Sequence, residues 1–322
     1  MGRRMHYIDA KLNQLAAIRP VRTAKPDYDD YWEGMIRSHT GQTPHADRAE
    51  AATELLGVRA CKVVYEGDAG TPIHGLYLLP PGRSDGEPPP CLVCFHGYTG
   101  SKGDPEDYAA WLLRGYGVFA VDVRGQSGET GNTMPNTYGM TKGWMTQGIL
   151  DKDTCYYKAV TADALRAVEW VLAQPETDPD RIVVMGGSQG GGIALLAAAF
   201  HPRVRAAVAD IPNMCQMDFG IFNSTGSLTE AAEFVNRHPE HLERVLTTLS
   251  YYDAVNCAER IACPILVSVG LKDTVCWPET VYAAYNAIAS PDKAIIAYPF
   301  AGHYTGAGHH RAVHAFLKRH LA

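Results

Sequence analysis

One short stretch limits what this chain can fold into: an apolar run, a serine enclosed by glycines, and a second apolar run. Residues 183–192 read Val-Val-Met-Gly-Gly-Ser-Gln-Gly-Gly-Gly, and residues 193–200 are predicted to be helical. The pattern Gly186-x-Ser188-x-Gly190 is typical of a sharp strand-to-helix turn that displays a serine hydroxyl at a sheet edge. Side chains at the flanking glycines would crowd such a turn. We therefore predict that Ser188 is a nucleophile; the alternative is an ordinary glycine-rich turn.

Composition narrows the class of protein. The 322 residues are 46% hydrophobic and 20% charged, which is typical of a globular chain with a sizeable core. The net charge is −6 and no basic tract occurs, so no nucleic-acid partner is expected. No apolar run reaches the length of a membrane span, and the polar start at residues 1–7 does not resemble a secretory signal. We expect a cytoplasmic protein that does not bind a membrane.

Two groups of residues are weighed as metal or redox sites, and neither is predicted to be one. Cys91 and Cys94 lie in a predicted strand, where residues three apart point to opposite faces. We predict free, packed cysteines there, and eight cysteines suggest disulfides only weakly in a chain this long. Asp27, Asp29 and Asp30 are predicted to form a solvated turn. No metal and no cofactor are predicted.

Strands and helices alternate along most of the chain. An antiparallel hairpin is predicted at residues 59–66 and 73–80, followed by near-continuous apolar strands with helices between them. This alternation predicts an α/β fold, with a mostly parallel central sheet and helices on both faces. The later strands are predicted at residues 91–95, 118–123, 182–185, 204–211, 265–269 and 294–298. The helices are predicted at residues 107–114, 155–172, 193–200, 280–289 and 312–320.

Two segments stand apart within the one domain that we expect over residues 1–322. Residues 1–57 are polar and aromatic, and we predict an N-terminal extension outside the core, with a short helix at 50–56. Residues 212–263 show no evident strand and are predicted to be helical at 227–236 and 241–251. A helical insertion of this kind is usually a lid, a pocket wall or an interface element.

A serine hydroxyl needs a base, and the base needs an acid that orients it. After a serine elbow, the acid and then the histidine come from loops that follow later strands. Asp273 follows the predicted strand at 265–269, and His303 follows the one at 294–298. We therefore predict a catalytic triad of Ser188, Asp273 and His303. The alternative for Asp273 is an aspartate that only forms a turn or caps a helix, and the alternative for His303 is an ordinary surface histidine.

Other residues compete for these roles, and two main-chain groups would complete the site. His309 and His310 are alternative bases, but both lie closer to the last helix. Asp253 lies in the insertion, and Asp292 precedes its strand at the wrong edge of the sheet. The oxyanion of an acyl transfer needs two N–H donors, one from the residue after the nucleophile and one from an earlier strand-end loop. The backbone N–H groups of Gln189 and Tyr98 are predicted to supply them.

The motifs together resemble a known family. Residues 124–126 (Arg-Gly-Gln), residues 186–190 (Gly-Gly-Ser-Gln-Gly) and His303 resemble the RGQ, GxSQG and HE motifs of carbohydrate esterase family 7. These are the acetyl xylan esterases and cephalosporin C deacetylases. The resemblance runs from about residue 5 to the C-terminus. The family's HE glutamate is absent, because Tyr304 follows His303.

The resemblance implies an α/β-hydrolase fold and a serine esterase that works through an acyl-enzyme without a metal or cofactor. It implies removal of acetyl groups from small substrates such as acetylated xylo-oligosaccharides and cephalosporin C, and in some members the formation of peracids. It also implies an intracellular homo-oligomer, commonly a hexamer with its active sites facing a cavity. Arg124 and Gln126 are expected to support the site, with Arg124 paired to Asp122 or another acid.

Three other functions remain open at this point. The chain is also consistent with a different α/β hydrolase, either a short-chain carboxylesterase or a peptidase. Peptidases of this type usually carry a large extra domain, for which 322 residues leave no room. A non-catalytic binding relative would not need all three triad residues. A structural or assembly protein finds no support, because the composition shows no repeats or heptads.

Overall fold

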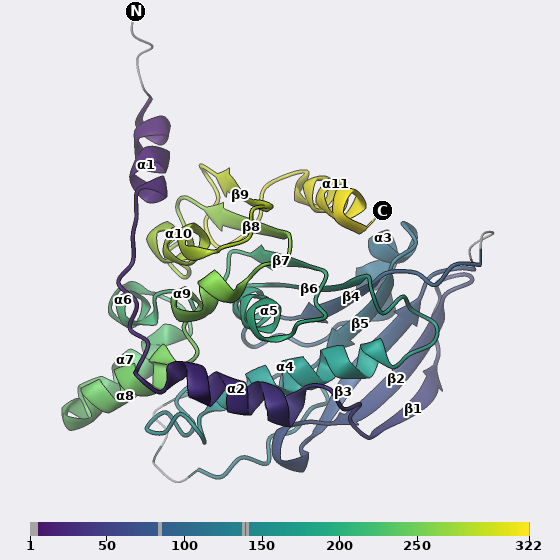
Figure 1. The fold of residues 1–322 in the computed structure, drawn as a ribbon, viewed down its shortest axis with the longest axis horizontal. Coiled ribbons are helices and arrows are strands. Elements are labelled where there is room, and N and C mark those ends of the chain that lie inside the picture. The colour runs from purple at the N-terminus through teal and green to yellow at the C-terminus, as the bar shows by residue number, and fades with distance from the viewer. Residues whose placement is uncertain (1–5, 83–85, 137–138, 140–141, 322) are drawn as a thin grey trace, which may run out of the picture.

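A nine-stranded sheet organises the structure (Figure 1). The computed structural model describes residues 6–82, 86–136, 139 and 142–321. The first residues of the predicted N-terminal extension, 1–5, lie outside this part, as do residues 83–85, 137, 138, 140, 141 and 322. The strands are β1 (Ala46–Ala51), β2 (Arg59–Glu66), β3 (Pro72–Leu79), β4 (Cys91–Phe95), β5 (Gly117–Val121), β6 (Ile182–Gly187), β7 (Ala206–Asp210), β8 (Ile265–Gly270) and β9 (Lys293–Tyr298).

The strand order is β1-β2-β3-β5-β4-β6-β7-β8-β9. The strands from β1 to β3 pair antiparallel, as does β3 with β5, and every neighbouring pair from β5 onward is parallel. The predicted hairpin and the predicted parallel strands are therefore confirmed. The parallel strands carry their carboxyl ends to one edge, where loops of an α/β sheet normally build a binding site.

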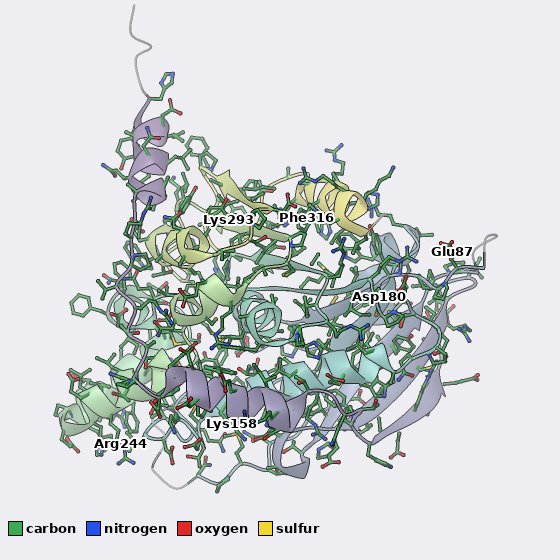
Figure 2. The ribbon with its side chains drawn as sticks, in the orientation of Figure 1. Glu87, Lys158, Asp180, Arg244, Lys293 and Phe316 are labelled. Atoms are coloured by element: carbon green, nitrogen blue, oxygen red, sulfur yellow. The ribbon has the colours of Figure 1, made fainter. Side chains whose placement is uncertain are left out.

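Helices cover both faces of the sheet (Figure 1). On one face, α2 (Tyr28–His39), α4 (Tyr156–Leu172), α5 (Gln189–Phe200) and α10 (Pro278–Ala287) share a core, in which Trp32 stacks on Phe200. On the other face lie α3 (Ala109–Leu112) and α11 (His309–Leu321), with Phe316 buried between α11 and the sheet (Figure 2). The N-terminal helix α1 (Tyr7–Ala16) lies beside α10, where Lys11 pairs with Glu279 at 2.5 Å.

The N-terminal segment differs from its prediction. The helix predicted at residues 50–56 is wrong, because Ala46–Ala51 forms β1 and pairs antiparallel with β2. The sequence of β1, Ala-Asp-Arg-Ala-Glu-Ala, has no apolar alternation, so only the tertiary pairing determines its conformation. Charged side chains suit this position, since they discourage further strand pairing at a sheet edge. Part of the predicted extension thus belongs to the sheet.

The segment between β7 and β8 is helical, as predicted. Its α-helices in the described residues are α6 (Met217–Asn223), α7 (Leu228–Arg237), α8 (Leu242–Ser250) and α9 (Ala254–Cys257). Asp253 is buried there and accepts hydrogen bonds from the backbone N–H groups of Gln216, Met217 and Val255. Within the described residues, no helix is long and apolar enough to cross a membrane.

Candidate active site

Ser188 occupies the sharp turn between β6 and α5. Its backbone has φ 55° and ψ −118°, a conformation that residues with a Cβ rarely adopt. A Cβ added to either Gly186 or Gly190 would overlap the carbonyl oxygen of Phe95 in β4. The two glycines of the motif are therefore required, because the turn passes directly against the neighbouring strand.

The three predicted triad residues form one hydrogen-bonded chain. The Ser188 hydroxyl lies 2.9 Å from Nε2 of His303, and Nδ1 of His303 lies 2.8 Å from Oδ2 of Asp273. The other carboxylate oxygen of Asp273 accepts hydrogen bonds from the backbone N–H groups of Val275 and Cys276. Because both oxygens of the buried carboxylate have partners, Asp273 is held in one orientation toward the histidine.

The alternative residues occupy other environments. His309 is buried against Asp210 and Tyr298, and His310 is exposed on α11. Asp253 holds backbone N–H groups of the insertion, and Asp292 precedes β9 at the opposite edge of the sheet from Ser188. The structure therefore does not bring any of these residues into hydrogen-bonding contact with the Ser188 hydroxyl.

Two backbone N–H groups lie beside the serine. Tyr98 belongs to the loop after β4, and a Cβ added to the preceding Gly97 would lie 3.7 Å from the Ser188 Cβ. Gln189 is the first residue of α5. Within the described residues, neither backbone N–H donates a hydrogen bond to another protein group. Both N–H groups are thus free to bind an oxygen at this position.

His96 fixes the start of the loop that carries Tyr98. Its Nε2 accepts a hydrogen bond from the backbone N–H of Val123, and its Nδ1 lies 2.8 Å from the carbonyl oxygen of Gly97. Burial lowers the pKa of His96, although the Gly97 carbonyl acts in the opposite direction. The neutral tautomer with its proton on Nδ1 satisfies both contacts. We infer that His96 braces the loop and is not a second base.

Gln126 joins the two segments that carry these N–H groups. Its Oε1 accepts a hydrogen bond from the backbone N–H of Thr99 at 2.8 Å. Its Nε2 donates to Oε1 of Gln189 at 3.0 Å and to the hydroxyl of Tyr156 at 2.9 Å. A single buried amide therefore holds the Tyr98 loop and the start of α5 at a fixed separation.

Arg124 lies behind this network and is fully buried. Its guanidinium makes two hydrogen bonds of 2.7 Å to Asp163 of α4. Asp122, the acid named first as its expected partner, instead pairs with Lys102 at 2.6 Å. The partner is thus another acid, as the sequence analysis allowed, and the bidentate pair fastens the strand-end loop to α4.

Two neighbours of the site have no local sequence motif. Glu230 of α7 accepts a hydrogen bond of 2.6 Å from the Tyr98 hydroxyl, a contact between residues far apart in the chain. The thiol of Cys276 is buried beside Ser188, and burial raises its pKa well above the usual value. Such a thiol stays neutral and does not compete as a nucleophile. Tyr304, which stands where the family has a glutamate, is 59% exposed, and its hydroxyl lies 3.5 Å from the carbonyl oxygen of Phe300.

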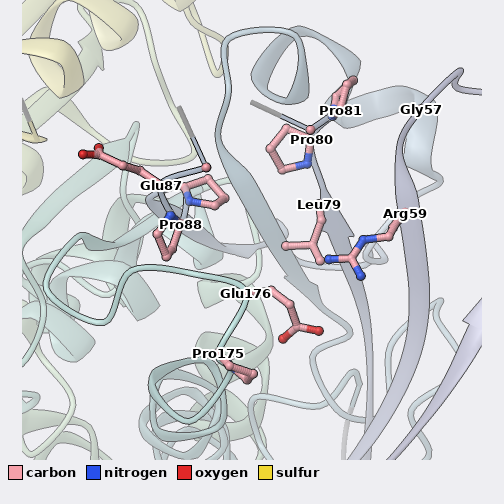
Figure 3. A pocket seen from close by; sticks show the side chains of 12 residues that line it. Gly57, Arg59, Leu79, Pro80, Pro81, Glu87, Pro88, Pro175 and Glu176 are labelled. Carbon is pink, nitrogen blue, oxygen red and sulfur yellow. The ribbon is translucent and has the colours of Figure 1, made fainter. Parts of the chain in front are cut away.

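A surface pocket lies elsewhere on the molecule (Figure 3). It has a volume of about 480 Å³ and is lined by Arg59, Leu79, Glu176 and several prolines. Two of these prolines, Pro88 and Pro89, precede β4, so the pocket lies at the amino ends of the parallel strands. None of its described lining residues is a predicted site residue.

Comparisons with known proteins agree with this geometry. The family model described as acetyl xylan esterase (AXE1) matches residues 5–320. An acetyl xylan esterase from Paenibacillus sp. R4 superposes with a TM-score of 0.91 at 37% identity, over 96% of this chain and 99% of that one. Acetyl xylan esterase 1 from Thermoanaerobacterium sp. JW/SL YS485 gives 0.89 at 31% identity, over 97% and 99%.

A curated relative extends the comparison. Acetyl esterase Axe7A of Xylanibacter ruminicola is 27% identical over 315 residues, which are 94% of this chain and 69% of that protein. The match of the family model spans nearly the whole chain, including each segment that surrounds Ser188. The chain therefore belongs to the acetyl xylan esterase family and is a carboxylic ester hydrolase of the α/β-hydrolase fold, as the sequence resemblance implies.

Proposed function

We propose that the protein removes acetyl groups from small esters through an acyl-enzyme on Ser188. The observation that carries this proposal is the chain of hydrogen bonds from the Ser188 hydroxyl through His303 to Asp273. Its order and distances are those of a general base that is oriented by a carboxylate and can take the serine proton. In this proposal three of the seven predicted site residues react or orient the base, two donate backbone N–H groups to the oxyanion, and two hold those donors in place.

The proposed reaction runs in two halves. Nε2 of His303 takes the proton of Ser188 as its oxygen attacks the acetyl carbonyl, and then gives that proton to the leaving alcohol. Water repeats the sequence on the acetyl-enzyme and releases acetate. Asp273 keeps the proton of the imidazole on Nδ1 and stabilises the imidazolium.

The backbone N–H groups of Tyr98 and Gln189 would hold the negative oxygen in both halves of the reaction. Removal of one such donor typically lowers kcat by about 10²–10³. Gln126 and Arg124 support these donors without touching the substrate. This division follows from their burial and their contacts with Thr99, Gln189 and Asp163.

The relatives support the substrate class. Proteins named acetyl xylan esterase and acetyl esterase are similar to this chain over most of its length. We propose acetylated xylo-oligosaccharides as substrates, with cephalosporin C as a second acetyl ester, and a homo-oligomer, a hexamer by family resemblance. The single domain over residues 1–322, with its helical insertion at 212–263, is proposed as the unit that carries this activity.

Ser188→Ala tests the proposed function. The variant should lose acetyl-ester hydrolysis by about 10⁴-fold or more while its circular dichroism and thermal unfolding stay unchanged. A fluorophosphonate should label the native protein and not the variant. Rates on acetyl, butyryl and octanoyl nitrophenyl esters, an acetylated xylobiose and a peptide nitroanilide should show a preference for acetyl esters. Near-normal activity of Ser188→Ala would refute the mechanism, and preference for the peptide would refute the substrate class.

A further inference from the structure

The side chain of Tyr98 is anchored by contacts of both its hydroxyl and its ring. Its hydroxyl donates a hydrogen bond of 2.6 Å to Oε2 of Glu230 and accepts hydrogen bonds from the backbone N–H groups of Trp144 and Met145 at 2.8 and 3.1 Å. Its ring meets the Trp144 ring edge to face, with centroids 5.3 Å apart. The one donor and both acceptor positions of the phenol are therefore occupied.

Glu230 lies in the first turn of α7 and is 6% exposed. A carboxylate at this position is favoured by the helix dipole. A Cβ added to Gly143 would overlap the Glu230 carboxylate, so the loop backbone packs directly against it. Burial raises the pKa of Glu230, whereas the hydrogen bond from Tyr98 lowers it. The backbone of residues 143–145 thus packs against one side of the hydrogen bond between the Tyr98 hydroxyl and the Glu230 carboxylate.

This contact joins three segments that are separate in sequence. Tyr98 comes from the loop after β4, residues 143–145 come from the long loop after β5, and Glu230 comes from the helical insertion. The backbone N–H of Tyr98 cannot move far while its side chain is fixed. Gln126 restrains the same loop at the next residue, Thr99, so the N–H of Tyr98 is held from two sides.

We propose that Glu230 is a positioning residue that fixes the Tyr98 N–H in the oxyanion hole. The proposal rests on the function proposed above, in which that N–H binds the developing oxyanion. The insertion then affects the rate of the reaction itself, because helix α7 holds a donor in place. The effect should appear in kcat, since the donor acts on charge that develops in the transition state.

Four variants test this role. Tyr98→Phe removes only the hydroxyl, Glu230→Ala removes the acceptor, and Glu230→Gln keeps a carbonyl oxygen that accepts the same hydrogen bond. Glu233→Ala is the matched control, because Glu233 lies on the same helix but its side chain is 47% exposed, and it lies 3.7 Å from Lys142. The measurements are kcat and KM for a nitrophenyl acetate, together with thermal unfolding.

Tyr98→Phe and Glu230→Ala should each lower kcat about tenfold, less than the 10²–10³ expected when a donor is removed outright. KM should change less than about twofold, because ground-state binding does not use the donor. Glu230→Gln should restore most of the rate, and Glu233→Ala should match the native protein. The double variant Tyr98→Phe/Glu230→Ala should lose no more than Tyr98→Phe alone, since that substitution already breaks the contact with Glu230.

Two results would overturn the proposal: an unchanged kcat in Tyr98→Phe, or losses confined to KM. If Glu230→Ala fails to fold, Tyr98→Phe still decides, because it replaces no residue of helix α7 or of the long loop and removes only the hydrogen bonds of one hydroxyl. Ser188→Ala separates this inference from the proposed function. Activity in Ser188→Ala would refute both, whereas an inactive Ser188→Ala beside a fully active Tyr98→Phe would refute only the role of Glu230.

Discussion

Two histidine–aspartate pairs among the described residues have nearly equal lengths but very different settings. His303 lies 2.8 Å from Asp273, and His309 lies 2.7 Å from Asp210. The His303 side chain is 29% exposed, whereas that of His309 is 5% exposed. A short contact between a histidine and an aspartate therefore does not by itself identify a catalytic base.

The two histidines also present opposite ring nitrogens to their carboxylates. In the first pair Nδ1 faces the acid, and Nε2 is left for the Ser188 hydroxyl. In the second pair Nε2 faces the acid, and Nδ1 lies 2.8 Å from the hydroxyl of Tyr298. The comparison teaches that catalytic use depends on which group the second nitrogen faces and whether substrate can reach it. The Tyr298 hydroxyl occupies the second nitrogen of His309, whereas in the proposed reaction the Ser188 hydroxyl gives its proton to His303.

The largest expected effect separates the two histidines directly. His303→Ala should lower kcat for acetyl esters by about 10⁴-fold or more, because the base is lost. His309→Ala should keep most of the activity but lower the free energy of unfolding by about 1–3 kcal/mol, because Asp210 loses its histidine partner and keeps only the hydrogen bond from Ser268 among its side-chain contacts in the described residues. Steady-state kinetics and chemical denaturation measure the two effects. Equal losses of kcat would break the distinction between the pairs.

The two acids give the next comparison. Asp273→Asn should lower kcat by about 10⁴-fold, because an amide no longer holds the imidazole in the tautomer that the serine needs. Asp210→Asn should leave kcat nearly unchanged. The group of Asp210 that contacts Ser188 is its backbone carbonyl, which accepts the Ser188 N–H at 2.9 Å and survives the substitution. Single-turnover rates would show whether the loss of rate in Asp273→Asn lies in the acylation step. A large loss of kcat in Asp210→Asn would contradict the proposal that Asp273, and not Asp210, orients the base.

The smallest expected effect concerns the tyrosine of the second pair. Tyr298→Phe removes one hydrogen bond to His309 and should lower the free energy of unfolding by about 1 kcal/mol. The value of kcat should stay the same, since Tyr298 does not contact the triad in the described residues. Urea denaturation and initial rates would test this. A tenfold drop in kcat would mean that the second pair is coupled to catalysis after all.

Part of the candidate site could be predicted from the sequence. In this part, the residue type that the chemistry needs occurs at the place in the chain order where the fold needs it. The glycines beside Ser188 and the loops that carry Asp273 and His303 follow local rules, because each residue type is needed at a strand end. The position of His303 directly after β9 also separated it from His309, which begins α11.

The remaining features depend on contacts that no local pattern encodes. The strand Ala46–Ala51 has no alternating apolar residues and is defined only by pairing with β2. The partner of Arg124 was open because several acids could reach it, and packing of α4 selects Asp163. Glu230 meets Tyr98 only after the insertion folds back over the sheet edge, so neither residue indicates the other in the sequence.

The backbone at residue 188 restricts which residue types could take the place of Ser188 as the proposed nucleophile. At φ 55° a β-branched side chain is strongly disfavoured, so threonine would strain the turn although it carries the same hydroxyl. Cysteine and aspartate carry only one heavy atom on Cβ, as serine does, and both serve as nucleophiles in other enzymes. A replacement nucleophile that this turn accepts would therefore form a thioester, if it is cysteine, or an anhydride, if it is aspartate.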